Sequence, residues 1–159
     1  MTRYFEKFYN SDPMVEISAD EASARDTYTI EDDVPMRRYR RFIDRELHTI
    51  IYAEWADPTE PLADFRRLAS GVPGQIFSPV TRLPHGGCSW TCWYVNADGT
   101  VKKALEPEFA ADGNFLRETL RGPEGTLITY TIYHYDRDGH LLELVTHAPD
   151  GTVLNTQDA

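Results

Sequence analysis

The amino-acid sequence predicts a mainly β fold, in which an antiparallel meander forms an open curled sheet or a small barrel and is joined by one or two short helices. Pairs of an acidic residue and glycine recur through the second half, and the segments between them are rich in β-branched and aromatic residues. Helical signals are confined to two short segments. With 159 residues the chain can bury a core, so we expect a single domain of three parts: residues 1–56, 57–87 and 88–159.

The first part has the pattern of short strands and one short helix. Residues 3–9 are β-prone, and residues 14–17 read as a second strand after Asp12-Pro13. Ser18 is followed three positions later by Glu21, a capping box that predicts a helix over residues 19–25. Residues 27–30 are β-prone again.

A hairpin is predicted at the end of the first part. Residues 39–43 and 47–55 are apolar and aromatic runs on either side of Asp44-Arg45-Glu46. Because no glycine is present, this hairpin must turn without the residue that most easily supplies a positive φ.

The second part is rich in proline. Its five prolines predict that no central strand occurs anywhere in this stretch; they are Pro58, Pro61, Pro73, Pro79 and Pro84. Residues 62–69 have apolar positions at helical spacing, with Pro61 in the first turn and Gly71 as a stop. We therefore expect a long covering loop that contains one short helix.

The third part contains an internal repeat of turns. Acid-glycine pairs recur at separations of 14, 12, 14 and 12 residues, at Asp98-Gly99, Asp112-Gly113, Glu124-Gly125, Asp138-Gly139 and Asp150-Gly151. Each interval holds one strand of ordinary length and one turn. Residues 88–155 are therefore expected to form consecutive antiparallel strands.

One segment of this repeat carries a family resemblance. Residues 133–151 read Tyr-His-Tyr-Asp-Arg-Asp-Gly-His-Leu at their start, which resembles the Tyr-x-Tyr-Asp-x-x-Gly-x-Leu pattern of tyrosine-aspartate repeats in Rhs-type proteins. The segment is also similar to shorter glycine-turn repeats of bacterial antitoxin-like β proteins, and a looser likeness extends over residues 94–125. The resemblance implies scaffolding or protein contact, and it specifies no activity.

Composition limits the partners and the compartment. A formal net charge of -10 argues against nucleic acid and against an anionic membrane surface as partners. The sequence shows no signal peptide and no membrane span. Cys88 and Cys92, on one extended strand, would lie about 13 Å apart, too far for a disulfide. We expect a cytoplasmic protein without a cofactor.

Alternation along the strands predicts one candidate catalytic group. Tyr130 and His134 share a face with Glu143 of the next strand, where His134 and Glu143 become diagonal neighbours. They could act as a general acid–base pair in an aromatic cavity, or form a polar patch at the wet end of a sheet. No metal site is expected, because His147 lies about 13 Å along its strand from Glu143.

Two arginines and two aromatic residues are candidate ligand-binding groups. Arg38 and Arg40, in the basic run of residues 37–41, could anchor an acidic group. Alternatively, this run is a strand face paired with the acids of residues 31–33. Trp90 and Tyr133 would supply aromatic surface to a ligand.

The closure of the sheet separates two classes of function. An open sheet with an aromatic face and acidic rims indicates a binding module for a protein partner, such as a basic toxin-like protein in the manner of an immunity protein or antitoxin. A closed barrel or cone indicates a site for a small apolar molecule and an enzyme of the isomerase or cyclase type. The sequence predicts no oligomeric state.

Overall fold

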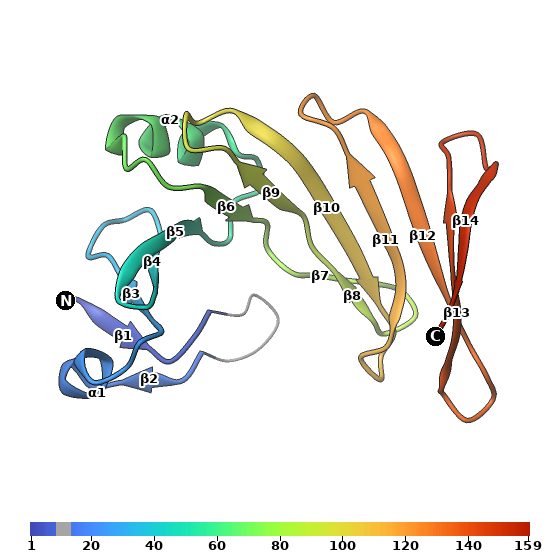
Figure 1. Cartoon of the computed structure of the whole chain (residues 1–159), viewed down its shortest axis with the longest axis horizontal. Coiled ribbons are helices and arrows are strands. Elements are labelled where there is room, and N and C mark those ends of the chain that lie inside the picture. Colours follow the sequence, from blue (N-terminus) through green and yellow to red (C-terminus); the bar gives the residue numbers. More distant parts are fainter. Residues whose placement is uncertain (9–13) are drawn as a thin grey trace. The chain divides into compact units, whose positions relative to one another are not determined.

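The structure, a computed structural model, describes residues 1–8 and 14–159. The predicted fold class is confirmed: strands dominate, pairing is mostly antiparallel, and two short helices occur in the described residues (Figure 1). The chain groups into two compact units, Met1–Val80 with Trp93–Val101, and Thr81–Cys92 with Lys102–Ala159. The expectation of a single folding domain stays a prediction.

The first unit is built on a curved mixed sheet. In hydrogen-bonded order its strands are β9 (Cys92–Val95), β6 (Gly74–Phe77), β5 (Glu46–Tyr52), β4 (Arg38–Ile43), β3 (Tyr28–Glu31), β1 (Arg3–Phe5) and β2 (Glu16–Ile17). The strands predicted near the N-terminus are present but shorter than expected. The part of that prediction that falls on residues 9–13 lies outside the described residues.

The predicted capping box starts helix α1 (Ala19–Ser23). The backbone N–H of Glu21 donates to Ser18 Oγ over 3.2 Å, and the Ser18 N–H donates to the Glu21 carboxylate over 2.8 Å. These two bonds satisfy donors that the first turn of a helix leaves open. The start of the helix was therefore predicted correctly, and its end lies two residues earlier than expected.

The predicted hairpin without glycine is β4–β5. Asp44 and Arg45 form its turn with φ values of 51° and 64°. Two successive positive φ values match the twist of a two-residue hairpin turn. Asp adopts the left-handed region of positive φ more readily than most residues, whereas a positive φ at Arg45 is sterically unfavourable.

The prediction that prolines exclude a central strand from residues 57–87 was wrong. Strand β6 lies between β5 and β9 and runs parallel to β5. Its four residues fit between Pro73 and Pro79, and Pro73 still contributes a carbonyl that accepts from Ile50 N over 3.2 Å. A proline next to a short strand therefore costs no hydrogen bond of the ladder.

Helix α2 (Thr59–Leu68) makes the crossover between the two parallel strands. It begins three residues before the predicted start, directly after a local turn in which the Asp57 carboxylate accepts from the backbone N–H of Thr59 over 2.8 Å. It ends with Ala69 in the left-handed conformation.

The core of this unit lies on both faces of β5. Ile50 and Tyr52 pack with the α2 side chains Leu62 and Phe65 and with Ile76 of β6. The opposite face of β5 contributes to a second cluster, made of Phe5, Tyr39, Ile51 and Ala53. Full burial of each large apolar side chain stabilises the fold by about 1.5–3 kcal/mol. Because both of its faces contribute such side chains, β5 is the central strand of the first unit.

The second unit is the predicted meander. In hydrogen-bonded order its strands are β14 (Val153–Asp158), β13 (Leu141–His147), β12 (Leu127–Tyr135), β11 (Phe115–Arg121), β10 (Val101–Phe109), β8 (Cys88–Ser89) and β7 (Thr81–Arg82). All five predicted turn glycines have positive φ values, between 81° and 90°; four of them lie in this unit, and Gly99 lies in the first. The single extended strand that was expected to carry both Cys88 and Cys92 is divided into β8 and β9 by Trp90 and Thr91.

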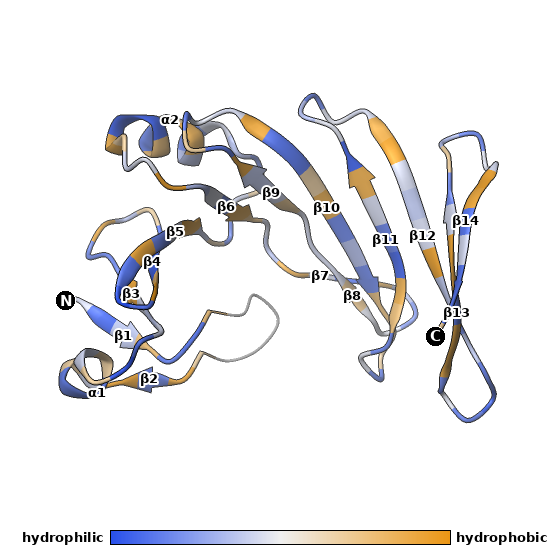
Figure 2. Ribbon diagram, viewed as in Figure 1, coloured by the Kyte–Doolittle hydropathy of each residue, from blue (hydrophilic) through white to orange (hydrophobic). Residues whose placement is uncertain are grey.

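The described strands form no closed barrel, and the sheet is open at β14. Of the barrel and open-sheet alternatives, the open sheet is therefore correct. Hydrophilic and hydrophobic residues are interspersed along β10–β12 (Figure 2). Across β11, β12, β13 and β14, Thr119 is the one buried residue. None of the described helices is long and apolar enough to cross a membrane.

Candidate functional site

Four aromatic rings form a continuous row across the strands of the second unit. Trp90 stacks on Phe109 with ring centroids 4.8 Å apart, Phe109 meets Phe115 at 4.2 Å, and Phe115 meets Tyr133 at 5.3 Å. These separations are typical of favourable ring pairs. We call these four residues the aromatic row; it joins Trp90 and Tyr133, the two aromatic residues predicted to bind a ligand.

A register shift places Phe115 in the aromatic row. Glu108 pairs with Arg117, but Phe109 pairs with Phe115, so one extra residue of β11 is accommodated at this point. Strict alternation would put Phe115 on the face of Arg117, whereas the bulge turns it toward Phe109 and Tyr133. Alternation alone therefore could not reveal the row.

The rings of the row are only partly covered. Phe115 is 36% exposed, and Trp90, Phe109 and Tyr133 are half-buried. Burial, with the nearby Glu118 carboxylate, raises the pKa of Tyr133 above its ordinary value. The phenol hydroxyl therefore stays protonated at neutral pH, so it can donate a hydrogen bond as well as offer apolar surface.

Acidic turns border the same end of the sheet. The row is next to the β10–β11 turn, which contains Asp112, and to the β12–β13 turn, which contains Asp136 and Asp138. Asp112 and Asp138 are exposed. Asp136 accepts the backbone N–H groups of Asp138 and His140, and these bonds hold the pKa of Asp136 below its ordinary value. The row is therefore flanked by negative charge at neutral pH.

The two residues of the predicted acid–base pair have a different relative position in the sheet from the one expected. His134 and Glu143 are directly opposite each other in the ladder, not diagonal, because the register shifts between His134 and Tyr135. His134 is exposed and Glu143 is half-buried. Within the described residues no hydrogen bond or ion pair joins the two side chains.

Tyr130 shares a face with His134 and Glu143, as predicted, but its ring contacts other residues. Its ring stacks on His147 with centroids 4.8 Å apart and an interplanar angle of 10°. The Arg117 guanidinium lies 4.5 Å from the Tyr130 centroid, a cation–π contact. Tyr130 of β12 therefore lies between Arg117 of β11 and His147 of β13, and the three side chains form one stack across three strands.

Arg38 and Arg40 lie in the first unit, where they share one carboxylate. Each donates its Nε–H to Asp32 over 2.7 Å. This matches the alternative in which the basic run pairs with the acids of residues 31–33. Arg38 also donates to Asp64 of α2 over 2.7 Å, a long-range contact that the sequence did not indicate.

Asp64 is the centre of this network. It is 4% exposed and accepts from Arg38, from the Tyr52 hydroxyl at 2.8 Å, and from Arg67. Burial alone would raise the pKa of Asp64, but the hydrogen bonds from Arg67, Arg38 and Tyr52 outweigh it and hold this pKa below its ordinary value. Burial and the bond to Asp64 raise the pKa of Tyr52.

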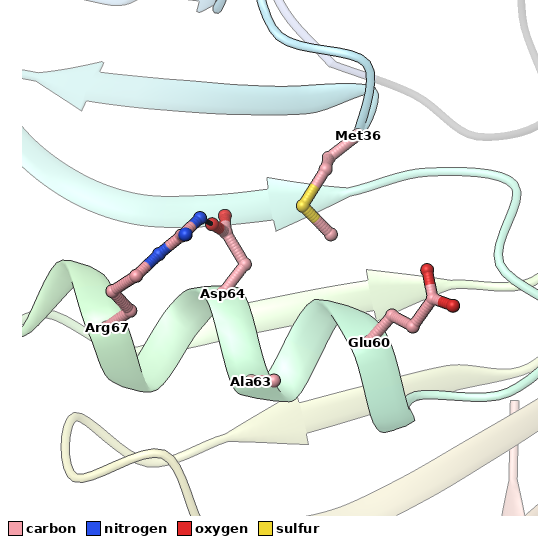
Figure 3. Close-up of a pocket in the computed structure, with 5 residues that line it drawn as sticks. All are labelled: Met36, Glu60, Ala63, Asp64 and Arg67. Atoms are coloured by element: carbon pink, nitrogen blue, oxygen red, sulfur yellow. Dashed lines mark hydrogen bonds and ion pairs between the residues drawn. The ribbon is translucent and has the colours of Figure 1, made fainter.

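One open pocket of about 340 Å³ lies beside this network and is lined by Met36, Glu60, Ala63, Asp64 and Arg67. Figure 3 shows Arg67 reaching to Asp64, with the Met36 thioether beside them and Glu60 pointing away. Because the Asp64 oxygens already accept three donors, this pocket offers no unused carboxylate at its base.

Among the described residues, a group that could hold a metal ion is Asp136, Asp138 and His140, whose ligand atoms lie within 4.8 Å of one another. All three belong to the β12–β13 turn, and Asp136 already accepts turn N–H groups. The turn itself accounts for this arrangement.

Comparison with protein family models, curated proteins and solved structures finds no match to the chain. The likeness of residues 133–151 to tyrosine-aspartate repeats therefore stays a prediction based on that motif alone.

Proposed function

We propose that the protein is a binding module that engages a protein partner through the aromatic row. The observation that carries this proposal is the sparse burial of the meander: four strands, β11–β14, bury only Thr119, yet two of them carry rings of an aromatic row that continues across β10. Apolar surface that remains open on an ordered scaffold is typical of an interaction site.

The chemistry of the row suits a protein interface. Large aromatic side chains contribute the most to interface energies, especially at the centre of a contact. An aromatic side chain can bury about 150–250 Å² in all, so half-buried rings still hold substantial area for a partner to cover. Since the rings are fixed by their neighbours, little side-chain entropy is lost on binding.

The charge beside the row suggests which partner fits. Asp112, Asp136 and Asp138 border the rings, and the whole chain has a formal net charge of -10. A basic partner would be attracted by this field and oriented by the turns. A basic protein, such as a toxin held by an immunity-like module, is therefore the proposed class of partner.

The enzyme alternative depended on a closed barrel or cone around Tyr130, His134 and Glu143. The sheet is open, and Tyr130 is occupied by Arg117 and His147. We therefore propose no catalytic role for these residues.

Site-specific photocrosslinking in the cells that make the protein tests the proposal. The photoreactive residue p-benzoylphenylalanine replaces Phe115 in one variant and Val153 in another. Val153 is 55% exposed, more than Phe115, and lies outside the row. We expect a discrete protein adduct from position 115 that is absent from position 153 and that weakens when Asp112 and Asp138 are changed to Lys. Equal adducts from both positions, or none from position 115, would refute a partner at the row.

A further inference from the structure

A second pocket of about 370 Å³ opens in the first unit beside the arginines of β4. Its polar lining is Asp32, Arg38, Arg40 and Ser70. We propose that it binds a small molecule that carries one carboxylate on an apolar body. This site uses residues of the first unit only, so it is independent of the proposed protein partner.

The lining of the pocket carries one cation in excess. Its charged side chains are Arg38, Arg40 and Asp32, and Arg38 also pairs with Asp64 of α2, which lies outside the lining. In a chain that is acidic as a whole, this is a local reversal of sign. One bound carboxylate would balance the cluster, whereas a dianion such as phosphate would leave it with excess negative charge.

Two residues of the lining, Arg40 and Ser70, carry donors that have no hydrogen-bond partner among the described residues. Arg40 uses Nε for Asp32, and its two Nη groups have no hydrogen-bond partner among the described residues. Ser70 Oγ is buried and also lacks a partner in the described part of the chain. A buried hydroxyl without a partner is costly, and rotation of the Ser70 side chain toward a ligand oxygen in the pocket would relieve that cost. The Arg40 fork and Ser70 together suit the two oxygens of a carboxylate.

The remaining lining is apolar. Leu47, Ile50 and Leu68 come from β5 and the end of α2. A volume of about 370 Å³ is at the lower end of the range for ligand pockets. The pocket therefore suits a short aliphatic or single-ring body attached to the carboxylate.

Binding of hexanoate to the full-length protein, measured by calorimetry, tests this inference. Hexan-1-ol has the same apolar chain without the charge, and inorganic phosphate has the charge without the chain. We expect saturable binding of one hexanoate per chain, at least about tenfold tighter than either control compound, because a charge-assisted pair with arginine is lost in one and the apolar contact in the other.

Variants locate the site. Arg40→Gln should weaken hexanoate about tenfold, and Ser70→Ala severalfold, since each removes one donor. Arg45→Gln is the matched control: Arg45 is an exposed arginine of the β4–β5 turn that pairs with Asp26 outside the pocket, and its loss should leave affinity unchanged. No saturable hexanoate binding up to about 10 mM, equal binding of hexan-1-ol, or unchanged affinity in both Arg40→Gln and Ser70→Ala would overturn the inference.

Discussion

At the scale of single residues, Asp64 is the one charged side chain that is buried among the described residues. It is almost fully buried, and three donors converge on its two oxygens. Replacing it with Ala leaves Arg38 and the Tyr52 hydroxyl with fewer partners in a buried site. We expect Asp64→Ala to lower the free energy of unfolding by about 3 kcal/mol, the usual cost of breaking a buried ion pair.

Urea unfolding measures this change, and Glu60→Ala is the control. Glu60 is an exposed acid of the same helix, so its loss should change the free energy of unfolding by less than about 0.5 kcal/mol. Similar losses from the two variants would contradict the central role of Asp64.

The same carboxylate predicts a pH dependence. The folded pKa of Asp64 lies below its ordinary value of 3.8, so its ionised form stabilises the folded state. This contribution is fully present above the unfolded pKa and is lost as the pH falls through the lower, folded pKa. Between pH 5 and pH 2, the free energy of unfolding should fall more steeply in the wild type than in Asp64→Asn. Parallel pH profiles would contradict this.

Sequence reasoning recovered part of this network. The acids of residues 31–33 lie close in sequence to Arg38 and Arg40, and β3–β4 pairing brings Asp32 to both arginines. Asp64 was missed because its contact depends on how α2 packs over β4 and β5, and no local pattern encodes that packing. The contacts of Tyr130 with Arg117 and His147 were likewise missed, since they cross two strand pairs.

At the scale of elements, the turn glycines are the clearest link from sequence to structure, and the β11–β12 turn provides an internal comparison. Gly125 has a φ of 81°, whereas Gly122 has no positive φ and a Cβ placed there would meet Ile128 at an ordinary 3.5 Å. We expect Gly125→Ala to lower the free energy of unfolding by about 1 kcal/mol, and Gly122→Ala to change it by less than half of that. Thermal or urea unfolding checks the difference; equal effects would contradict the assigned turn conformation.

The helices, hairpins and turns were easier to predict than the short strand between prolines and the bulge that interrupts regular strand pairing. The capping box of α1, the β4–β5 hairpin and the glycine turns follow from local chemistry, and all are present. The parallel strand β6 was missed because it is only four residues long and lies between two prolines. The bulge that redirects Phe115 was missed because register shifts depend on the partner strand.

At the scale of the whole molecule, the expectation of a single folding domain can be tested with tryptophan reporters. Trp55 and Trp90 lie in the first and second units respectively. One variant, Trp55→Phe/Trp93→Phe, retains Trp90, and another, Trp90→Phe/Trp93→Phe, retains Trp55. Because a meander with so few buried side chains lacks the core that independent stability requires, we expect both reporters to show one coincident urea transition. Two separated transitions would show independently folding units.

The fold class was predictable because the repeat spacing and strand composition agree along the second half of the chain. Closure of the sheet was not, since an open sheet and a barrel share the same alternation and the same turns. The aromatic row depends on that outcome and on one bulge, so Trp90 and Tyr133 could be selected from the sequence only as aromatic residues, without the two rings that connect them.

The central claim is that a protein partner binds over the aromatic row. The most direct test is the affinity of the partner identified by crosslinking, once purified, for the Phe115→Ala/Tyr133→Ala variant and for Val153→Thr. Truncating two ring contacts at an interface should cost at least about 2 kcal/mol, or about 30-fold in affinity. We predict that loss for the double variant with unchanged folding, and no change for Val153→Thr. Wild-type affinity in the double variant would contradict the account.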